Sequence, residues 1–352
     1  MTSLPSPELF SGSASLLSHQ SRWQPGQAAR QDLLRRFGNQ SSSYFNLQDG
    51  VERFGARGVG FIAYRPVRCL GTTYNFVFAN PVCEPGMRRW LLNSFLETVP
   101  GRHLFLGIDE KVATELQSLG MRLNEFGTEF SVPLEEFSVA GKSKKQLRHA
   151  YNLDKREPIE VREQSWDQVD ADAVREISEG WRQHKTVSSR ELRLLTRPPV
   201  FGDEWGVRKF YAYKNGKMLG YVFFDPFFED GKVVGYTANI LRQNMDEAPT
   251  GLLDHIILKA IDRFREEGIR ELSLGISPLH DVQAMPGDRK LIRWICQFLY
   301  ERGNSFYAFK ALSYHKTRYR GNANKWYIAT DSSSSFNIAL SALKGTQLLP
   351  AW

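Results

Sequence analysis

"PTGLLDHIILKAIDRFREEGIRELSLGI", residues 249–276, is the stretch of sequence that decides the fold. Its first part repeats apolar residues at helical spacing, and Gly268 stands where such a helix would end. The part that follows, residues 269–276, reads as a short apolar strand. Helices and strands that alternate in this way build α/β proteins. The predicted apolar stripe of the helix consists of Leu252, Leu253, Ile256, Ile257, Ala260, Ile261 and Phe264.

The predicted strand ends in turn-forming residues, because Gly275, Ser277 and Pro278 precede the polar pair that begins at His280. In open α/β sheets, ligands bind at the carboxyl ends of the strands. A plain turn would explain the same residues without a ligand. We predict that Gly275 and Ser277 line a bound substrate.

The first part of the chain alternates in the same manner. Runs rich in β-branched and aromatic residues are typical of strands, and apolar residues at helical spacing are typical of helices. Strands are predicted over 59–67, 72–82, 103–108 and 128–134, and helices over 85–99 and 110–120. Together they make one α/β unit.

After a basic stretch the alternation begins again. Asn215-Gly216 is a strong hairpin signal inside residues 207–228. Further elements are predicted over 171–185 (helix), 232–242 (strand) and 289–303 (helix). The order of elements resembles that of the first half, although no residue-level repeat is visible. We predict a flexible leader at 1–30, an N-terminal unit at 31–140, a basic connecting helix at 141–160 and a C-terminal unit at 161–352.

Composition limits the function classes. The net charge is +7, and the three cysteines, Cys69, Cys83 and Cys296, lie far apart without a CxxC motif. A disulfide framework and a structural zinc site are therefore not expected, and no metal or cofactor is predicted. The sequence has neither a membrane-spanning apolar run nor the pattern of a secretion signal, so we expect a cytoplasmic protein.

The junction between a strand and the decisive helix, residues 239–255, is the first candidate site. Arg242 ends the strand, and the helix opens at Pro249-Thr250-Gly251. Free amides at a helix start attract anions, and Arg242 would add a charged contact. The order resembles the pyrophosphate loop of GNAT acetyltransferases, although only one glycine is present. An ordinary loop with Thr250 as the helix cap is the alternative, and Asp254 could simply complement the helix dipole.

Two basic segments, residues 141–157 and 306–327, are the second candidate site. In the later one, cations alternate with aromatic rings, which suits a phosphate backbone with stackable bases. The alternative is a half-buried strand with a solvated basic face. Motifs of covalent nucleophiles are absent from the sequence, so an enzyme would join two substrates directly. The cations of the later segment are Lys310, Lys316, Arg318, Arg320 and Lys325.

Several segments in this order resemble the catalytic domain of phosphatidylglycerol lysyltransferases and their relatives, the DUF2156 group. The similar segments are "NFVFANPVCEP" (75–85), "FGTEFSVPLEEFSVAGKSKKQLRHAYN" (126–152), residues 248–279 and "YAFKALSYHKTRY" (307–319). The resemblance covers about residues 50 to 330. It implies two tandem GNAT-like domains that transfer an aminoacyl group from aminoacyl-tRNA to a lipid or small-molecule acceptor, with contact at the inner membrane surface as a further expectation.

The resemblance also assigns roles to residues. It implies Asp254 as proton acceptor with Glu129 in reserve, and Arg242 as support for an oxyanion or phosphate. The expected substrate-binding residues are Thr250, Gly251, Gly275, Ser277, Asn239 and Tyr236. The expected contacts to the tRNA end are Arg148, Asn152, Lys310, Lys316 and Arg318.

The chain departs from the family pattern at two acids. Asn80 and Asn239 stand where the family has acidic residues, and Thr250 replaces its asparagine. Fewer acids argue against a cationic lysyl group as the transferred unit. Two alternatives stay open: a GNAT enzyme that uses acyl-CoA, and a non-catalytic scaffold that binds RNA or a membrane surface.

Overall fold

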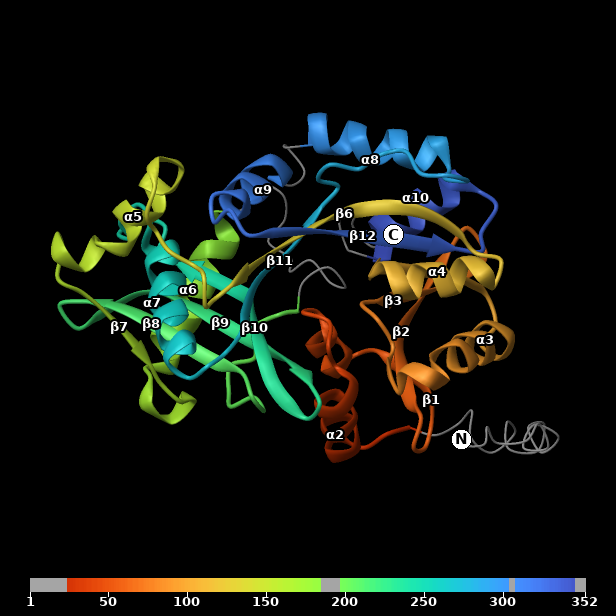
Figure 1. The fold of residues 1–352 in the computed structure, drawn as a ribbon, viewed down its shortest axis with the longest axis horizontal. Coiled ribbons are helices and arrows are strands. Elements are labelled where there is room, and N and C mark those ends of the chain that lie inside the picture. The colour runs from red at the N-terminus through yellow and green to blue at the C-terminus, as the bar shows by residue number, and fades with distance from the viewer. Residues whose placement is uncertain (1–23, 185–196, 304–307, 346–352) are drawn as a thin grey trace, which may run out of the picture.

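The computed structural model describes residues 24–184, 197–303 and 308–345. Within these residues, twelve strands form one mixed sheet that runs through the whole molecule, with helices on its faces (Figure 1). Along the sheet the order is β1-β2-β3-β5-β12-β6-β11-β10-β9-β8-β7, and the short β4 pairs with β2. The prediction of a mixed α/β fold is confirmed.

The N-terminal half carries antiparallel strands followed by a parallel crossover. Strands β3 and β5 pair in parallel, and helix α3 connects them. The strands of this half are β1 (Glu52–Ala56), β2 (Gly60–Cys69), β3 (Thr72–Phe78), β4 (Val82–Cys83) and β5 (Arg102–Ile108). Its helices are α2 (Gln27–Phe37), α3 (Arg88–Thr98) and α4 (Glu110–Ser118).

The C-terminal half repeats this order. Strands β10 and β11 pair in parallel across helix α7, after three antiparallel strands. Its strands are β7 (Ile159–Glu163), β8 (Arg208–Lys214), β9 (Lys217–Glu229), β10 (Lys232–Gln243) and β11 (Glu271–Pro278). Its helices are α6 (Ala171–Gln183), α7 (Leu252–Glu266), α8 (Lys290–Arg302), α9 (Phe309–Thr317) and α10 (Ser335–Gly345).

Two strands join the halves. Strand β6 (Arg122–Pro133) leaves the N-terminal half and pairs with β11, while β12 (Asn322–Thr330) returns from the C-terminal half and lies between β5 and β6. The halves therefore share one sheet, whereas the sequence predicted two separate units. Pairing between strands so distant in sequence leaves no local signal.

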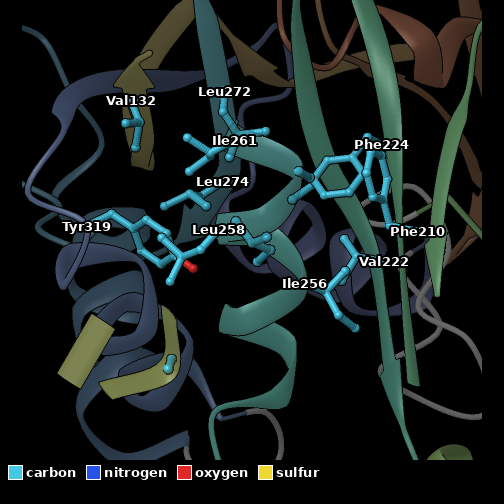
Figure 2. Packing of buried hydrophobic residues seen from close by; sticks show 14 of the residues in the cluster. Val132, Phe210, Val222, Phe224, Ile256, Leu258, Ile261, Leu272, Leu274 and Tyr319 are labelled. Carbon is cyan, nitrogen blue, oxygen red and sulfur yellow. The ribbon is translucent and has the colours of Figure 1, made fainter. Parts of the chain in front are cut away.

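Helix α7 forms as the apolar stripe predicts. Six of its seven stripe residues are buried, and Gly268 adopts the left-handed conformation (φ 75°) just beyond its end. Figure 2 shows Ile256, Leu258 and Ile261 packed between β8–β9 and β11. The predicted hairpin is also confirmed, because Asn215 and Gly216 have positive φ values of 51° and 83°.

Two predicted boundaries need correction. Helix α2 begins at Gln27, inside the expected leader, of which residues 1–23 lie outside the described residues. The basic connector is no single helix, because α5 (Lys145–Tyr151) lies between two short 3₁₀ turns and β7 already begins at Ile159. Leu147 and Ala150 of α5 pack into the same core as α7.

Candidate active site

Strands β10 and β11 pair over a short distance and then part. Their parallel register covers three residue pairs, the last of which is Thr237 with Ser273, although β10 continues to Gln243 and β11 to Pro278. Beyond Ser273, strand β11 bulges, and Gly275 has a φ of 75°. Backbone that leaves a ladder offers hydrogen-bonding groups to a ligand.

A buried carboxylate lies beside this point. Glu129 projects from β6 and accepts hydrogen bonds from Ser273 Oγ (2.6 Å) and Trp326 Nε1 (3.0 Å). Burial raises the pKa of Glu129, and these two hydrogen bonds oppose that rise. The carboxyl group is thus held in one position, with three strands fixing it.

Lys316 reaches the same place from helix α9. Its Nζ donates to the carbonyl of Ile276 at 2.7 Å. A Cβ atom added at Gly275 would lie 3.5 Å from Lys316 Nζ and 3.9 Å from Thr237 Cγ2, so the amine lies close to Gly275, where β11 has left its pairing with β10. Burial lowers the pKa of Lys316 to about 7, although the charge of Glu129 acts in the opposite direction. An amine of this kind can gain or lose a proton near neutral pH.

Lys316 was predicted to hold the tRNA end, and its side chain is only 8% exposed. The other residues predicted to contact tRNA have protein partners. Arg148 donates to the carbonyls of Val139 and Gly141, and Asn152 donates to the carbonyl of Arg148 at the end of α5. Lys310 forms an exposed ion pair with Glu301 at 2.6 Å.

Asp254 is bound on all sides by α9 and the residues after it. It accepts hydrogen bonds from Arg318 and from Tyr319 Oη, each at 2.8 Å, and its Oδ1 lies 2.9 Å from His315 Nε2. Burial alone would raise the pKa of Asp254, but His315, Arg318 and Tyr319 together hold it below its usual value. The carboxylate therefore ties α7 to α9.

The start of α7 lies against α5. Gly251 has a φ of 90°, and a Cβ atom there would lie 3.3 Å from the Cβ of Ala150. Arg242 is buried, with its guanidinium 3.7 Å from the ring centre of Trp181 on α6. Thr250 is exposed and the cap residue of α7 is Gly251, so the alternative of an ordinary loop capped by Thr250 does not hold.

The residues predicted from β10 and β11 separate between the two faces of the sheet. Tyr236 stacks on Phe264 of α7, with ring centres 4.6 Å apart, so it belongs to the core and not to a substrate site. Side chains alternate along a strand, and Thr237 consequently points to the opposite face. Ser277 is buried, and its hydroxyl has no hydrogen-bond partner among the described residues.

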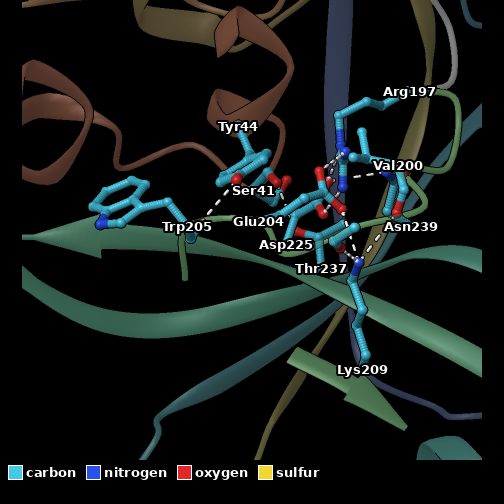
Figure 3. Close-up of polar contacts among 11 residues, drawn as sticks. Ser41, Tyr44, Arg197, Val200, Glu204, Trp205, Lys209, Asp225, Thr237 and Asn239 are labelled. Carbon is cyan, nitrogen blue, oxygen red and sulfur yellow. Dashed lines mark hydrogen bonds and ion pairs between the residues drawn. The ribbon is translucent and has the colours of Figure 1, made fainter. Parts of the chain in front are cut away.

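A buried charge network continues the site across β10 and β9 (Figure 3). Asp225 lies opposite Thr237 in the β9–β10 register and accepts two hydrogen bonds from Arg197, at 2.6 and 3.1 Å. Arg197 also pairs with Glu204, and Asn239 donates to Asp225 at 2.9 Å. Burial would lower the pKa of Arg197, but Asp225 and Glu204 raise it above its usual value.

The sequence reasoning missed Ser273, Trp326, Arg197 and Asp225. Asp225 did leave a signal, since it interrupts the apolar run "VFFDPFF" (222–228) of a predicted strand. The three cysteines are buried free thiols, and burial raises the pKa of Cys83 and Cys296 to about 12. Among the described helices, none has the length and apolarity needed to cross a bilayer.

The fold and this site define a mixed α/β protein whose large sheet parts over a buried acid and a buried lysine. Residues 31–330 match the family model described as phosphatidylglycerol lysyltransferase, C-terminal, and the chain belongs to this family.

Named relatives share modest identity with the chain. It is 22% identical to phosphatidylglycerol lysyltransferase of Bacillus subtilis over 247 residues, which are 67% of this chain and 27% of that protein. It is 21% identical to an uncharacterised protein of Corynebacterium glutamicum over 334 residues, or 91% and 41% of the two chains. The chain therefore spans less than half the length of these curated relatives.

Solved structures share the fold over nearly the whole chain. The C-terminal DUF2156 domain of an Agrobacterium fabrum protein assigned as a lysylphosphatidylglycerol synthetase has a TM-score of 0.72 at 20% identity and covers 92% of this chain and 98% of its own. L-PGS from Bacillus licheniformis has a TM-score of 0.74 at 17% identity, with coverage of 92% and 97%. FemX is more distant, with a TM-score of 0.52 at 10% identity and coverage of 87% and 96%.

Proposed function

We propose that this chain transfers an aminoacyl group from aminoacyl-tRNA to a hydroxyl or amine of a lipid or small molecule. The observation that carries the proposal is Lys316, a buried amine that donates to the carbonyl of Ile276 next to Gly275, where β10 and β11 part, and that feels the charge of Glu129. The family supports it, because a phosphatidylglycerol lysyltransferase by its name transfers a lysyl group to a lipid. We read the two halves as tandem GNAT-like units that share a sheet.

The reaction needs positioning and one proton transfer. An aminoacyl ester is already activated, so alignment with the acceptor supplies much of the rate. The acceptor O–H or N–H attacks the ester carbonyl carbon, and Lys316 Nζ takes its proton. The tetrahedral intermediate then expels the ribose oxygen, which receives that proton from Nζ. One acyl bond to the acceptor forms as the ester C–O bond breaks.

Lys316 suits this step because of its environment. A general base works best when its pKa is near the working pH, and burial brings the pKa of Lys316 to about 7. Glu129, fixed by Ser273 and Trp326, would stabilise the ammonium form that exists during the transfer. This assignment replaces Asp254 as the proton acceptor in our proposal.

Asp254 acts in this proposal as a positioning residue. Its lowered pKa makes it a weak base, and its carboxylate contacts His315 of α9 and the two residues that follow that helix. Since Lys316 lies on α9 between two of those partners, His315 and Arg318, the carboxylate sets where the amine can stand.

Phosphate contacts remain at the ends of the site in our proposal. Arg242 and the amides at Thr250–Gly251 lie where β10 leads into α7, and amides at a helix start favour an anion. The residues that we assign to the tRNA end are the basic Arg148, Lys310 and Arg318, with the amide of Asn152.

We further propose that the side chain of the transferred aminoacyl group is uncharged. The two acids on the β9 side, Asp225 and Glu204, are already paired with Arg197 in the interior. An added substrate ammonium would compete with that internal cation. Asn239, which donates to Asp225, adds no charge of its own.

The test replaces Lys316 with methionine, which keeps the length of the side chain and removes the amine. We expect turnover to fall about 10²- to 10⁴-fold with labelled aminoacyl-tRNA and phosphatidylglycerol vesicles, as is usual when a general base is removed. Lys217→Met is the matched control, since that amine is exposed, is paired with Glu247 and has no role in the proposed site. Its turnover should stay close to that of the parent.

Three donors separate the alternatives. Release of the acyl group from aminoacyl-tRNA supports the proposal. We expect aminoacyl-tRNAs whose amino acid has a neutral side chain to react faster than lysyl-tRNA. Release from acyl-CoA alone would identify the second enzyme class. Full activity of Lys316→Met, or tight RNA binding without release from either donor, would overturn the catalytic assignment.

A further inference from the structure

Helix α8 has apolar side chains on two sides, whereas a helix on a protein surface is normally apolar only on the side that faces the core. Its inner side packs Ile292 and Cys296 into a core cluster with residues of β5, β6 and β12. Its outer side exposes Leu291 (51%), Trp294 (58%) and Phe298 (50%). Trp294 and Phe298 stack, with ring centres 5.3 Å apart. Positions 291, 294 and 298 follow helical spacing, so they form one outward stripe.

The two helices that contact α8 also expose large apolar side chains. Helix α8 runs along the outer edge of the molecule in Figure 1 and contacts both α9 and α10. Tyr314 on α9 is 59% exposed, and Phe336 on α10 is 65% exposed. Nine large apolar side chains are exposed among the described residues, and five of them lie on these three helices. Such a concentration marks an interaction surface and not random exposure.

Positive charges stand at both ends of the stripe. Lys290 lies one turn before Trp294 and Arg302 one turn after Phe298, and both side chains are exposed. The acids nearest in sequence are engaged, since Asp288 pairs with Arg293 and Glu301 with Lys310. The outward stripe therefore reads cation, three apolar side chains, cation.

We propose that this stripe, residues 290–302 of α8, docks the protein onto the surface of an anionic phospholipid bilayer. Amphipathic helices with tryptophan and phenylalanine on one side and flanking cations lie in the bilayer interface. Aromatic rings prefer the headgroup level, and lysine and arginine attract anionic lipids. A protein partner would equally accept the apolar side chains, but the cations at both ends favour a surface of negative charge.

The docking surface lies next to an element of the candidate active site. Helix α9, which carries the buried Lys316, contacts α8. This surface stands on exposure and charge, and does not depend on which acyl donor the enzyme uses.

The experiment measures sedimentation of the full chain with vesicles. Phosphatidylserine mixed equally with phosphatidylcholine supplies negative charge without the glycerol headgroup of the proposed acceptor, so binding reports the surface and not the active site. We expect the parent to bind these vesicles and to bind pure phosphatidylcholine more weakly. Trp294→Ala with Phe298→Ala should reduce binding at least about tenfold, because membrane affinity scales with the apolar area inserted.

Two further variants make the test specific. Phe201→Ala with Met245→Ala removes two exposed apolar side chains from another face and should bind like the parent. Lys290→Gln with Arg302→Gln should weaken binding to anionic vesicles about fivefold for each charge, and leave binding to phosphatidylcholine unchanged. Thermal unfolding of each variant shows that it is folded.

Other occupants predict different results. Failure of the folded parent to bind anionic vesicles overturns the proposal, and so does full binding by the Trp294/Phe298 variant. If sedimentation equilibrium shows a dimer that this variant converts to a monomer, while neither binds vesicles, the stripe is a contact between two copies. An unchanged rate of acyl transfer to a soluble acceptor with lost vesicle binding supports the proposal and leaves the active-site assignment intact.

Discussion

The two halves of the sheet contain the same parallel strand–helix–strand crossover, but the two strands of each crossover end differently. Strands β3 and β5 stay paired to the end of β3, where Phe78 pairs with Leu106 and the next amide, of Ala79, donates to the carbonyl of Leu106 at 3.1 Å. Strands β10 and β11 part after Thr237 and Ser273. One pair is closed and the other is open.

A glycine follows the paired region in both halves. Gly107 in β5 has a φ of 67° and Gly275 in β11 has a φ of 75°. Beside Gly107 lie the rings of Phe78 and Trp326, at 3.0 and 3.2 Å from an added Cβ atom. Beside Gly275 lies Lys316 Nζ at 3.5 Å. The same backbone irregularity thus borders packed rings in one half and a buried amine in the other.

Polar side chains also close the first pair. Gln40 donates to the carbonyl of Gly107 at 3.0 Å and accepts from the amide of Asn80 at 2.7 Å, so its side chain occupies the groups that the strand ends leave. In the open pair, Thr237 Oγ1 donates to the carbonyl of Ser41 at 2.6 Å, and the backbone carbonyl of Ile276 accepts from the buried amine of Lys316 at 2.7 Å. Chemistry therefore depends on what neighbouring elements insert between the strands, and not on the crossover itself.

The largest effect on stability is expected from replacing Arg197, which neutralises the two buried acids Asp225 and Glu204 of the C-terminal half. Arg197→Met leaves Asp225 and Glu204 buried without their main cation, and breaking a buried pair from one side costs about 3–5 kcal/mol. The free energy of unfolding, measured by urea titration, should fall by that amount. Arg175→Met, which removes an exposed ion pair, should change it by less than about 1 kcal/mol.

A second substitution sharpens this result. Adding Asp225→Asn to Arg197→Met removes one of the stranded charges and should restore part of the lost stability. If Arg197→Met alone were as stable as the parent, Arg197, Asp225 and Glu204 would not form a closed charge network. The C-terminal half would then have room for a substrate ammonium, and the proposal of an uncharged side chain on the aminoacyl group would fail.

The two glycines give a direct test of the comparison. Both alanine variants place a side chain in the left-handed region, which costs about 1–2 kcal/mol. Gly107→Ala also meets the rings at 3.0 and 3.2 Å, so its loss of stability should be larger by about 1 kcal/mol or more. Gly275→Ala meets Lys316 Nζ and Thr237 Cγ2 at ordinary contact distances of 3.5 and 3.9 Å. Its stability loss should therefore be the smaller and, because the new methyl group contacts Lys316, its loss of turnover the larger.

Unfolding and single-turnover assays on the same preparations decide this pair. The two variants should rank in opposite order in the two measurements. The same rank in both would mean that stability alone controls turnover, and that the open pair has no special role.

Periodicity predicted the local elements of both halves but not how they assemble. The stripe of α7 and the Asn215-Gly216 hairpin are fixed by contacts within a few residues, and both were predictable. The insertion of β12 between β5 and β6 joins segments about two hundred residues apart, and their pairing depends on the whole sheet.

The candidate site shows the same limit. Glu129 and Lys316 were both singled out, yet Lys316 stood among five cations in a row that looked solvent-exposed. Its burial follows from the packing of α9 against β11, which no local pattern records. Asp254 was recognised on the first turn of α7, but its partners on and after α9 are sixty residues away in sequence.

A smaller effect is expected at Asp254, which holds α9 over the open pair. The pKa of Asp254 is lower in the folded than in the unfolded protein. Its carboxylate therefore stabilises the fold above the unfolded pKa of about 4, and this stability is lost as the pH falls through the folded pKa. Asp254→Asn should therefore lower the free energy of unfolding by about 1–3 kcal/mol at pH 7. The difference from the parent should shrink below about pH 4.

Turnover separates the two roles of Asp254. If Asp254 only positions Lys316, Asp254→Asn should reduce turnover moderately, and the midpoint of the pH profile of turnover should stay the same. Complete loss of turnover with unchanged stability would instead return the proton-acceptor role to Asp254 and remove it from Lys316.

The smallest expected effect is a shift of the pH profile when Glu129 becomes glutamine. Lys316 acts as a base in its neutral form, so turnover of the parent should rise with pH through about 7. The charge of Glu129 raises the pKa of Lys316, and its removal must lower that pKa. The profile of Glu129→Gln should therefore move to lower pH. The glutamine oxygen can still accept from Trp326 Nε1, and its amide nitrogen can donate to the Ser273 hydroxyl. A shift to higher pH, or a profile without a midpoint near neutrality in the parent, would mean that the open pair holds its lysine for binding and not for proton transfer.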